Sequence, residues 1–148
     1  MSTIEPSVRD AIERLHAAMG KVAMGDVSAI KALCSHSDEA TSFYGWGGYE
    51  KGWKAVSERW DWAGRQFKGG TVSHHILTTL VSGDLAFTTA IETFRARMDG
   101  MERPTQWSNR VTHVFRREDG AWRLLHRHAN RLEDQYRPAT RLEPDPLT

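Results

Sequence analysis

The chain has 148 residues, a length that suits one domain with a core large enough to need neither disulfides nor a metal. With 20 Lys and Arg against 19 Asp and Glu, the net charge is +1, and no charge excess points to nucleic acid or to a membrane surface. Cys34 is the single cysteine, no long apolar run is present and the N-terminus is polar, so we expect a cytoplasmic protein without a signal peptide.

Three helices are predicted in the first half of the chain. Residues 6–20 repeat apolar side chains at helical spacing, and Pro6 suits the first turn. Asp26 is a good N-cap for a short second helix that ends at Cys34. The third helix ends near Phe67, before Gly69 and Gly70, and places on one stripe Trp53, Val56, Trp60, Ala63 and Phe67.

From residue 71 the hydrophobic period changes to two, which is typical of strands. A short strand is also expected at 41–44, before a glycine-rich turn. Helices followed by a strand meander predict an α+β fold in which the helices pack on one face of a curved antiparallel sheet. The four main strands are expected near 71–82, 85–98, 104–117 and 121–131. We expect a single domain over 1–131 and a Pro-containing C-terminal tail over 132–148.

The turns set a register, and the register decides which side chains share a face of the sheet. We pair Val81 with Ala86 across the first turn and centre the next loop on Met101, which places Glu92 opposite Arg110 on a mixed outer face. The inner face then combines large apolar groups with a polar row: Val72, His74, Ile76, Thr78, Leu80, Phe87, Thr89, Ile91, Thr93, Trp107, Asn109, Val111, His113, Phe115, Trp122, Leu124, His126 and His128. Because buried imidazoles and amides need partners, this face predicts a polar-lined pocket.

Three segments resemble one superfamily. They are Gly25-Asp-Val-Ser-Ala-Ile30, then Phe43-Tyr-Gly45 with Gly47, Gly48 and Gly52-Trp53, and the closing stretch from Val114 to His128 around Gly120-Ala-Trp122. Over residues 7–131 the chain is similar to the nuclear-transport-factor-2-like superfamily, in its SnoaL-like and ketosteroid-isomerase-like branch. The resemblance implies a cone-shaped sheet around a long helix, a pocket in the concavity and a homodimer formed through the outer sheet face.

The resemblance does not imply ketosteroid isomerisation. Where those isomerases have a carboxylate base, a tyrosine and a second acid, this chain has Tyr44, Ala18 and His113, so all three chemical roles change. Scytalone-dehydratase-like members use histidines with tyrosine and asparagine neighbours, which is closer to this chain.

His113 and His126 are the candidate catalytic residues, because our register pairs them and an imidazole exchanges protons near neutral pH. The alternative is a hydrogen-bonded polar pair in a partly wet core. Tyr44 and Trp46 are expected at the mouth of the pocket, although packing under a turn also explains them. The full set of expected ligand-binding residues is Tyr44, Trp46, His74, Thr89, Asn109 and His128.

No metal and no cofactor are expected. His113, His126 and His128 supply imidazoles, but no inward carboxylate is predicted to orient them, and the glycine spacing from Gly45 to Gly52 fits no phosphate-binding loop.

Two functions remain open. One is a protein that binds a small, partly apolar molecule and catalyses cofactor-free isomerisation, cyclisation or dehydration through His113 or His126. The other is a non-catalytic ligand-binding or dimeric association domain. Neither function involves nucleic acid or a membrane.

Overall fold

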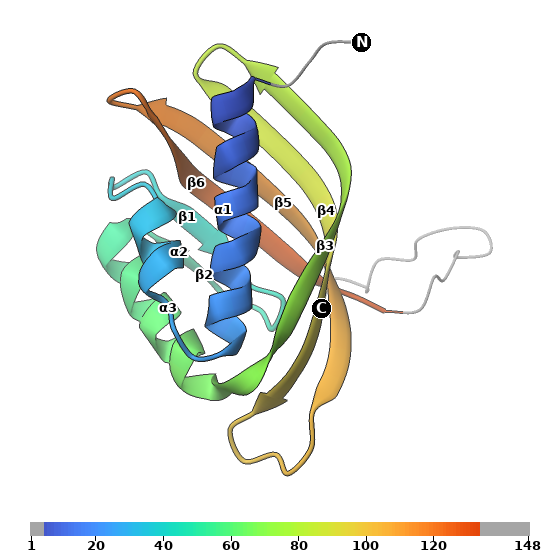
Figure 1. Ribbon diagram of the computed structural model, residues 1–148. Helices are drawn as coiled ribbons and strands as arrows, with labels where there is room; N and C mark the ends of the chain where they lie inside the picture. The colour runs from blue at the N-terminus through green and yellow to red at the C-terminus, as the bar shows by residue number, and fades with distance from the viewer. Residues whose placement is uncertain (1–4, 134–148) are drawn as a thin grey trace, which may run out of the picture.

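A computed structural model describes residues 5–133 of the chain. Helices come first and long strands follow, as expected from the change of hydrophobic period (Figure 1). The elements are α1 (Pro6–Ala23), α2 (Ser28–Leu33), β1 (Thr41–Phe43), β2 (Tyr49–Lys51), α3 (Trp53–Gln66), β3 (Phe67–Ser82), β4 (Leu85–Met98), β5 (Thr105–Glu118) and β6 (Ala121–Leu132).

The strands form one six-stranded sheet in the order β2-β1-β6-β5-β4-β3. Neighbours run antiparallel except β1, which lies parallel to β6. The sheet curves around α1, while α2 and α3 lie beside that helix and close one side of the concavity (Figure 1). The predicted α+β cone is therefore confirmed.

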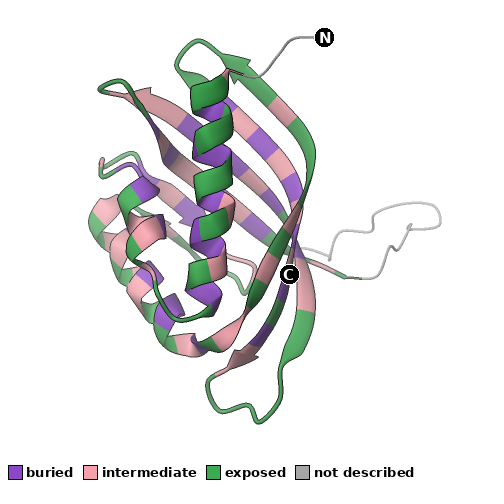
Figure 2. Cartoon of the chain, viewed as in Figure 1, coloured by how far each residue is buried: buried purple, intermediate pink, exposed green. Residues whose placement is uncertain are grey.

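Helix α1 forms because apolar residues recur every three or four positions after Pro6. Figure 2 shows the consequence: exposed residues lie on the face of α1 that points away from the sheet, and buried residues lie behind them. Leu15 is completely buried and Met19 nearly so. The buried stripe is Val8, Ala11, Ile12, Leu15, Ala18, Met19, Val22 and Ala23.

Helix α3 passes into strand β3 without a loop, because Gln66 ends the helix and Phe67 begins the strand. We expected Gly69 and Gly70 to end the helix. Instead both lie inside β3 with positive φ, and a Cβ atom on Gly70 would overlap the Arg95 carbonyl oxygen and Ala96 of β4. The glycine is required there by the close approach of two backbones.

The register between β4 and β5 differs by one residue from our prediction. Glu92 pairs with Asn109 and not with Arg110, so the two faces of β4 are exchanged. Thr88, Ala90 and Glu92 face inward and are buried. The assumption that bulky groups face the helices was wrong for this strand, because α1 lies close to the sheet and small side chains make room for it. The bulkier alternate residues Phe87, Thr89 and Ile91 therefore lie on the outer face.

A β-bulge in β6 moves two predicted pocket residues to the outer face. Trp122 and Leu124 face inward as predicted, but Leu125 is an extra residue, since Phe115 pairs with Leu124 and Val114 pairs with His126. Beyond this bulge the alternation is shifted by one residue. His126 and His128 therefore face outward, and the inner positions are taken by Arg127 and Ala129.

A second irregularity, between Ile76 and Thr78 in β3, turns Thr78 and Leu80 to the outer face, whereas His74 stays on the inner one. Within residues 5–133 no helix has the length and apolar character needed to cross a bilayer. The expected C-terminal tail lies outside the described residues, apart from its first two.

Candidate functional site

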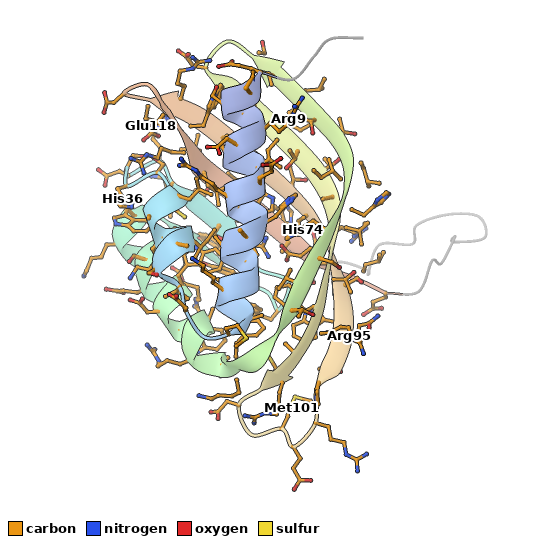
Figure 3. All side chains as sticks on the ribbon, viewed as in Figure 1. Arg9, His36, His74, Arg95, Met101 and Glu118 are labelled. Atoms are coloured by element: carbon orange, nitrogen blue, oxygen red, sulfur yellow. The ribbon has the colours of Figure 1, made fainter. Side chains whose placement is uncertain are left out.

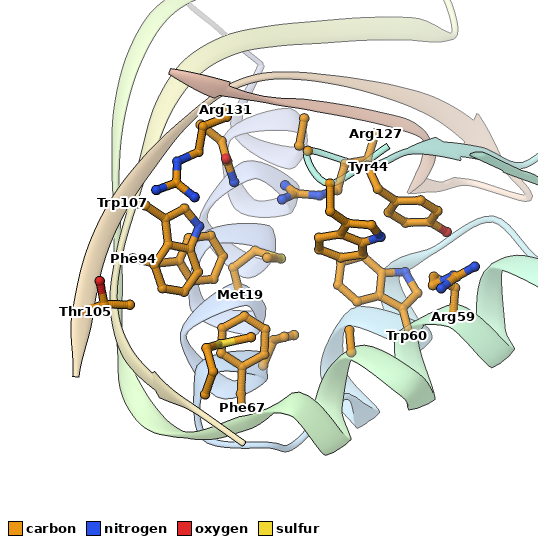
Figure 4. A pocket seen from close by; sticks show the side chains of 17 residues that line it. Met19, Tyr44, Arg59, Trp60, Phe67, Phe94, Thr105, Trp107, Arg127 and Arg131 are labelled. Atoms are coloured by element: carbon orange, nitrogen blue, oxygen red, sulfur yellow. The ribbon is translucent and has the colours of Figure 1, made fainter. Parts of the chain in front are cut away.

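A cavity of about 300 Å³ lies between the open end of the cone, helix α3 and the turn that joins β1 to β2. Aromatic side chains from five different elements or turns meet around it, and Met19 of α1 closes its inner end (Figure 4). The aromatic lining residues are Tyr44, Trp46, Trp60, Phe67, Phe94 and Trp107. This combination of a preformed hollow and a largely apolar lining is characteristic of small-molecule sites.

Two aromatic walls face each other across the cavity. On one side Phe94 and Trp107 stack with ring centroids 4.9 Å apart and planes within 1°, and Phe67 stacks on Phe94 at 5.4 Å. On the other side Tyr44 stacks on Trp46 at 5.1 Å. Figure 4 shows Trp107 and Phe94 across the cavity from Tyr44 and Trp60. A flat apolar group fits between two such walls.

The Tyr44–Gly48 turn holds one aromatic wall in place. Gly45 passes so close to Asn109 and to the β6 backbone that an added Cβ would lie 3.3 Å from the amide oxygen. Trp46 lines the cavity although it is 59% exposed. Arg59 of α3 lies over the Tyr44 ring at 5.4 Å and donates to Glu50 of β2 at 2.9 Å. These contacts join the turn to α3.

The polar groups that line the cavity are hydrogen-bond donors or amides. They are Tyr44, Thr105, Asn109, Arg59, Arg127 and Arg131, and no Asp, Glu or His is among the residues that line it. Burial raises the pKa of Tyr44 to about 12, so this phenol keeps its proton. The site can therefore stabilise negative charge on a ligand, but its lining offers no base at neutral pH.

Arg127 connects the cavity to a buried ion pair behind it. Its Nη2 donates to Oε1 of Glu92 at 2.6 Å, and its Nη1 donates to Oε2 at 3.0 Å. Glu92 is fully buried and Arg127 is 7% exposed. Burial opposes ionisation of Glu92, but Arg127 and His74 together outweigh it and hold the pKa of this carboxyl well below its usual value. The pair is ionised and spans β5 to join β4 to β6.

His113 lies between these two strands and is also completely buried. Arg127 can only donate, so Nε2 of His113 accepts its hydrogen bond at 2.8 Å and the imidazole proton is on Nδ1. Nδ1 has no hydrogen-bond partner among residues 5–133. Burial, with Arg127 adding to it, places the pKa of His113 well below the usual value. The ring is neutral and lies behind the cavity lining.

His74 completes the buried cluster on the side of α1 (Figure 3). Its Nε2 lies 2.8 Å from Oε2 of Glu92, and its ring stacks on His16 of α1 with centroids 3.9 Å apart. Burial lowers the pKa of His16 to about 4. The cluster of His16, His74, Glu92, His113 and Arg127 therefore contains one anion, one permanent cation and three imidazoles, of which His16 is partly exposed and the other two are buried.

The structure brings together only some of the residues predicted for the site. Tyr44, Trp46 and Asn109 line the cavity. His74 and His113 share the inner face but lie in the buried cluster. Their expected neighbours Thr89, His126 and His128 lie on the outer face because of the β4–β5 register and the β6 bulge. The predicted contact between His113 and His126 is wrong.

On the outer face Nδ1 of His126 forms a hydrogen bond of 2.7 Å with the Thr41 hydroxyl. Phe43 packs edge-on against both His126 and His128. Burial lowers the pKa of His126. Among the described residues there is no cluster of His, Cys, Asp and Glu with the size of a metal site.

Sequence reasoning missed the charged residues of the site. Glu92 and Arg127 alternate with apolar neighbours along their strands, a pattern that predicts exposure to solvent. Only the bulge turns Arg127 inward. Arg59 lies off the apolar stripe of α3, and Arg131 lies at the end of β6. A signal for Glu92 was present, since an acid two residues from Ala90 and Phe94 on one strand face is unusual unless a cation meets it.

We expect Glu92→Gln to lower the free energy of unfolding by about 3–5 kcal/mol, because it leaves the Arg127 guanidinium buried without its anion. Glu50→Gln is the matched control: it removes the partner of Arg59, a pair in which both side chains are partly exposed, and it should cost about 1 kcal/mol or less. Urea denaturation of both variants measures the difference. Equal losses would contradict the structural importance of the buried pair.

Stability should also fall in mild acid. The unfolded chain protonates His113 below its ordinary pKa of 6.5, whereas the folded chain keeps it neutral, so the unfolded state binds more protons. The free energy of unfolding should therefore decrease as pH falls from about 7.5 to about 5.5, by at most about 1.4 kcal/mol per pH unit for this group. His113→Gln should flatten the profile, whereas His75→Gln, on an exposed residue, should not. Parallel pH profiles for the parent and both variants would show that His113 is not the source of the pH dependence.

The same cone occurs in known structures of low sequence identity, which show the fold alone. A nuclear transport factor 2-like superfamily protein from Salmonella enterica is 19% identical, with a TM-score of 0.76 over 90% of this chain and 94% of that one. A ketosteroid isomerase-like protein from Erwinia carotovora atroseptica is 14% identical, with a TM-score of 0.73 over 86% and 95%. The CaMKII hub of S. rosetta is 21% identical, with a TM-score of 0.66 over 88% and 100%.

Among curated proteins, none matches the chain in sequence. The sequence profile of the SnoaL-like domain matches residues 8–130, which include α2, α3, all but the first two residues of α1 and almost the whole sheet. Together with the cone of six strands around α1, this match establishes that the chain belongs to the SnoaL-like domain family.

Proposed function

We propose that this protein binds a small, flat and partly apolar molecule in the cavity between the two aromatic walls. The observation that supports this best is the lining itself: stacked rings on both sides, with the polar groups gathered on β5 and β6 and around the β1–β2 turn. Such an arrangement buries the body of a ligand and orients one end of it.

Imidazole-based proton transfer, the activity expected from the sequence, has less support than binding. His113 lies behind Arg127, and His126 lies on the other face of the sheet. The groups that do reach the cavity donate hydrogen bonds and keep their protons. We therefore favour a binding function, in which any chemistry would depend on stabilisation of negative charge by the arginines of the lining.

Tryptophan fluorescence tests the binding site directly, because Trp46, Trp60 and Trp107 line it. We expect 2-naphthol, a neutral flat probe, to change the emission in a saturable manner. Ala129→Leu should abolish the change by filling the cavity, because Ala129 is a buried lining residue. Ala17→Leu, on the exposed face of α1, should bind as the parent does. Unaltered binding by a folded Ala129→Leu variant would contradict the assignment.

A second proposed function, self-association through the outer sheet face, has its own support. This face exposes large apolar side chains: Leu80 is 55% and Leu85 49% exposed, and Phe87, Ile91 and Val114 are half-buried beside them. Exposed apolar surface of this kind commonly marks an interface. One structural neighbour is a hub domain, and the partner we propose is a second copy of this chain.

We expect sedimentation equilibrium to give a dimer for the parent protein and a monomer for Ile91→Lys, because the substitution places a charge at the centre of the outer face. Met24→Lys is the control, since Met24 is 65% exposed but lies at the end of α1, away from this face. A monomeric parent, or a dimer that tolerates Ile91→Lys, would overturn the proposal.

A further inference from the structure

We propose that the ligand of the cavity is a carboxylate, and that Arg127, Arg131 and Asn109 bind its anionic group. This inference rests on the proposed binding function, because it specifies the chemistry of the molecule that occupies the same cavity. It follows from three features of the site: the unused edge of the Arg127 guanidinium, the balance of charge around the cavity, and the placement of Ala129.

The Arg127 guanidinium has a free edge. Of its five N–H groups, two donate to the two oxygens of Glu92 and a third donates to Nε2 of His113. The remaining two, on Nε and on Nη2, lie on the same edge of the planar group. Among residues 5–133 no hydrogen bond occupies that edge. Two parallel N–H groups match the two oxygens of a carboxylate.

Glu92 and His113 hold the guanidinium in place before any ligand arrives. Both partners are completely buried, and together they fix the guanidinium through its other three N–H groups. The ligand therefore does not have to order a flexible side chain, which reduces the entropic loss on binding. Arg127 itself lines the cavity, so the free edge is available to a bound molecule.

The charges around the cavity leave one cation without an anion. Three arginines line it, Arg59, Arg127 and Arg131, and two of them have carboxylate partners, Glu50 and Glu92. Three cations minus two anions leave one positive charge, on Arg131. Within residues 5–133 Arg131 forms no ion pair, and no acidic side chain lines the cavity. A ligand with one negative charge completes the balance.

Strand β6 places the two arginines on the same side of the cavity. Alternation along a strand puts residues 127, 129 and 131 on one face, and Figure 4 shows Arg131 beside Trp107 and Arg127 beside Tyr44. Ala129 lies between them, and its single methyl group leaves room for a bound group. Asn109 of β5 pairs with Arg131 of β6 and adds an amide at the same position.

Two probes of the same shape separate the carboxylate from the apolar body: 2-naphthoic acid and 2-naphthamide. We expect the parent protein to bind the acid at least about tenfold more tightly than the amide by calorimetry, since charge-assisted bidentate bonds replace neutral ones. Arg131→Gln should weaken acid binding about fivefold and leave amide binding unchanged. Arg9→Gln, on the exposed face of α1, should alter neither and is the matched control.

Arg127 is tested with its partner, because Arg127→Gln alone leaves Glu92 buried without a cation. The double variant Glu92→Gln with Arg127→Gln removes both charges together. We expect it to bind the amide as the parent does and to lose the preference for the acid. Equal affinity of the parent for acid and amide, or an unchanged preference in both arginine variants, would overturn the carboxylate assignment and leave the binding site intact. Binding of neither probe nor of 2-naphthol would overturn the proposed function itself.

Discussion

The ion pair between Glu92 and Arg127 is the constraint on which the interior of this protein depends. A carboxylate and a guanidinium removed from water must meet each other and satisfy their remaining hydrogen-bonding groups. Here Glu92 is on β4 and Arg127 on β6, and His113 of β5 fills the space between them. The pair therefore fixes the inner faces of three adjacent strands at once, and a slip of one residue in any of them would separate it.

The same pair explains where the cavity lies. Large aromatic groups occupy the open end of the cone, whereas the region beneath α1 contains small side chains on β4 and the charged cluster. Arg127 lies at the boundary between these two regions, because its Nη atoms bind the cluster and its side chain lines the cavity. The polar row predicted from the sequence exists, but it supports the lining of the cavity from behind.

The parts of the fold that local patterns determine were predictable. The stripe of α1, the pairing of Val81 with Ala86 across a Gly-Asp turn, and the inward Trp122 all follow from spacing and turn chemistry. The pairing of β4 with β5 did not follow, because the loop over residues 99–104 has no turn type that fixes its centre. The bulge at Leu125 could not be predicted either, because the residues around it have the pattern of an ordinary strand. Arg127 is buried only through its contacts with other strands, which the local sequence does not show. Three of the expected site residues consequently lie on the opposite face.

The direct passage from α3 to β3 bears on how a ligand reaches the cavity. Trp60 and Phe67 belong to one continuous piece of chain without a hinge, so this side of the lining is rigid. The turn at residues 44–48 differs, since its Gly47 and Gly48 have positive φ and no close neighbours, and Trp46 is largely exposed. We therefore expect a ligand to exchange with solvent past residues 46–48 of this turn. Its sequence would set how long a ligand stays bound, while β5 and β6 set which ligand is chosen.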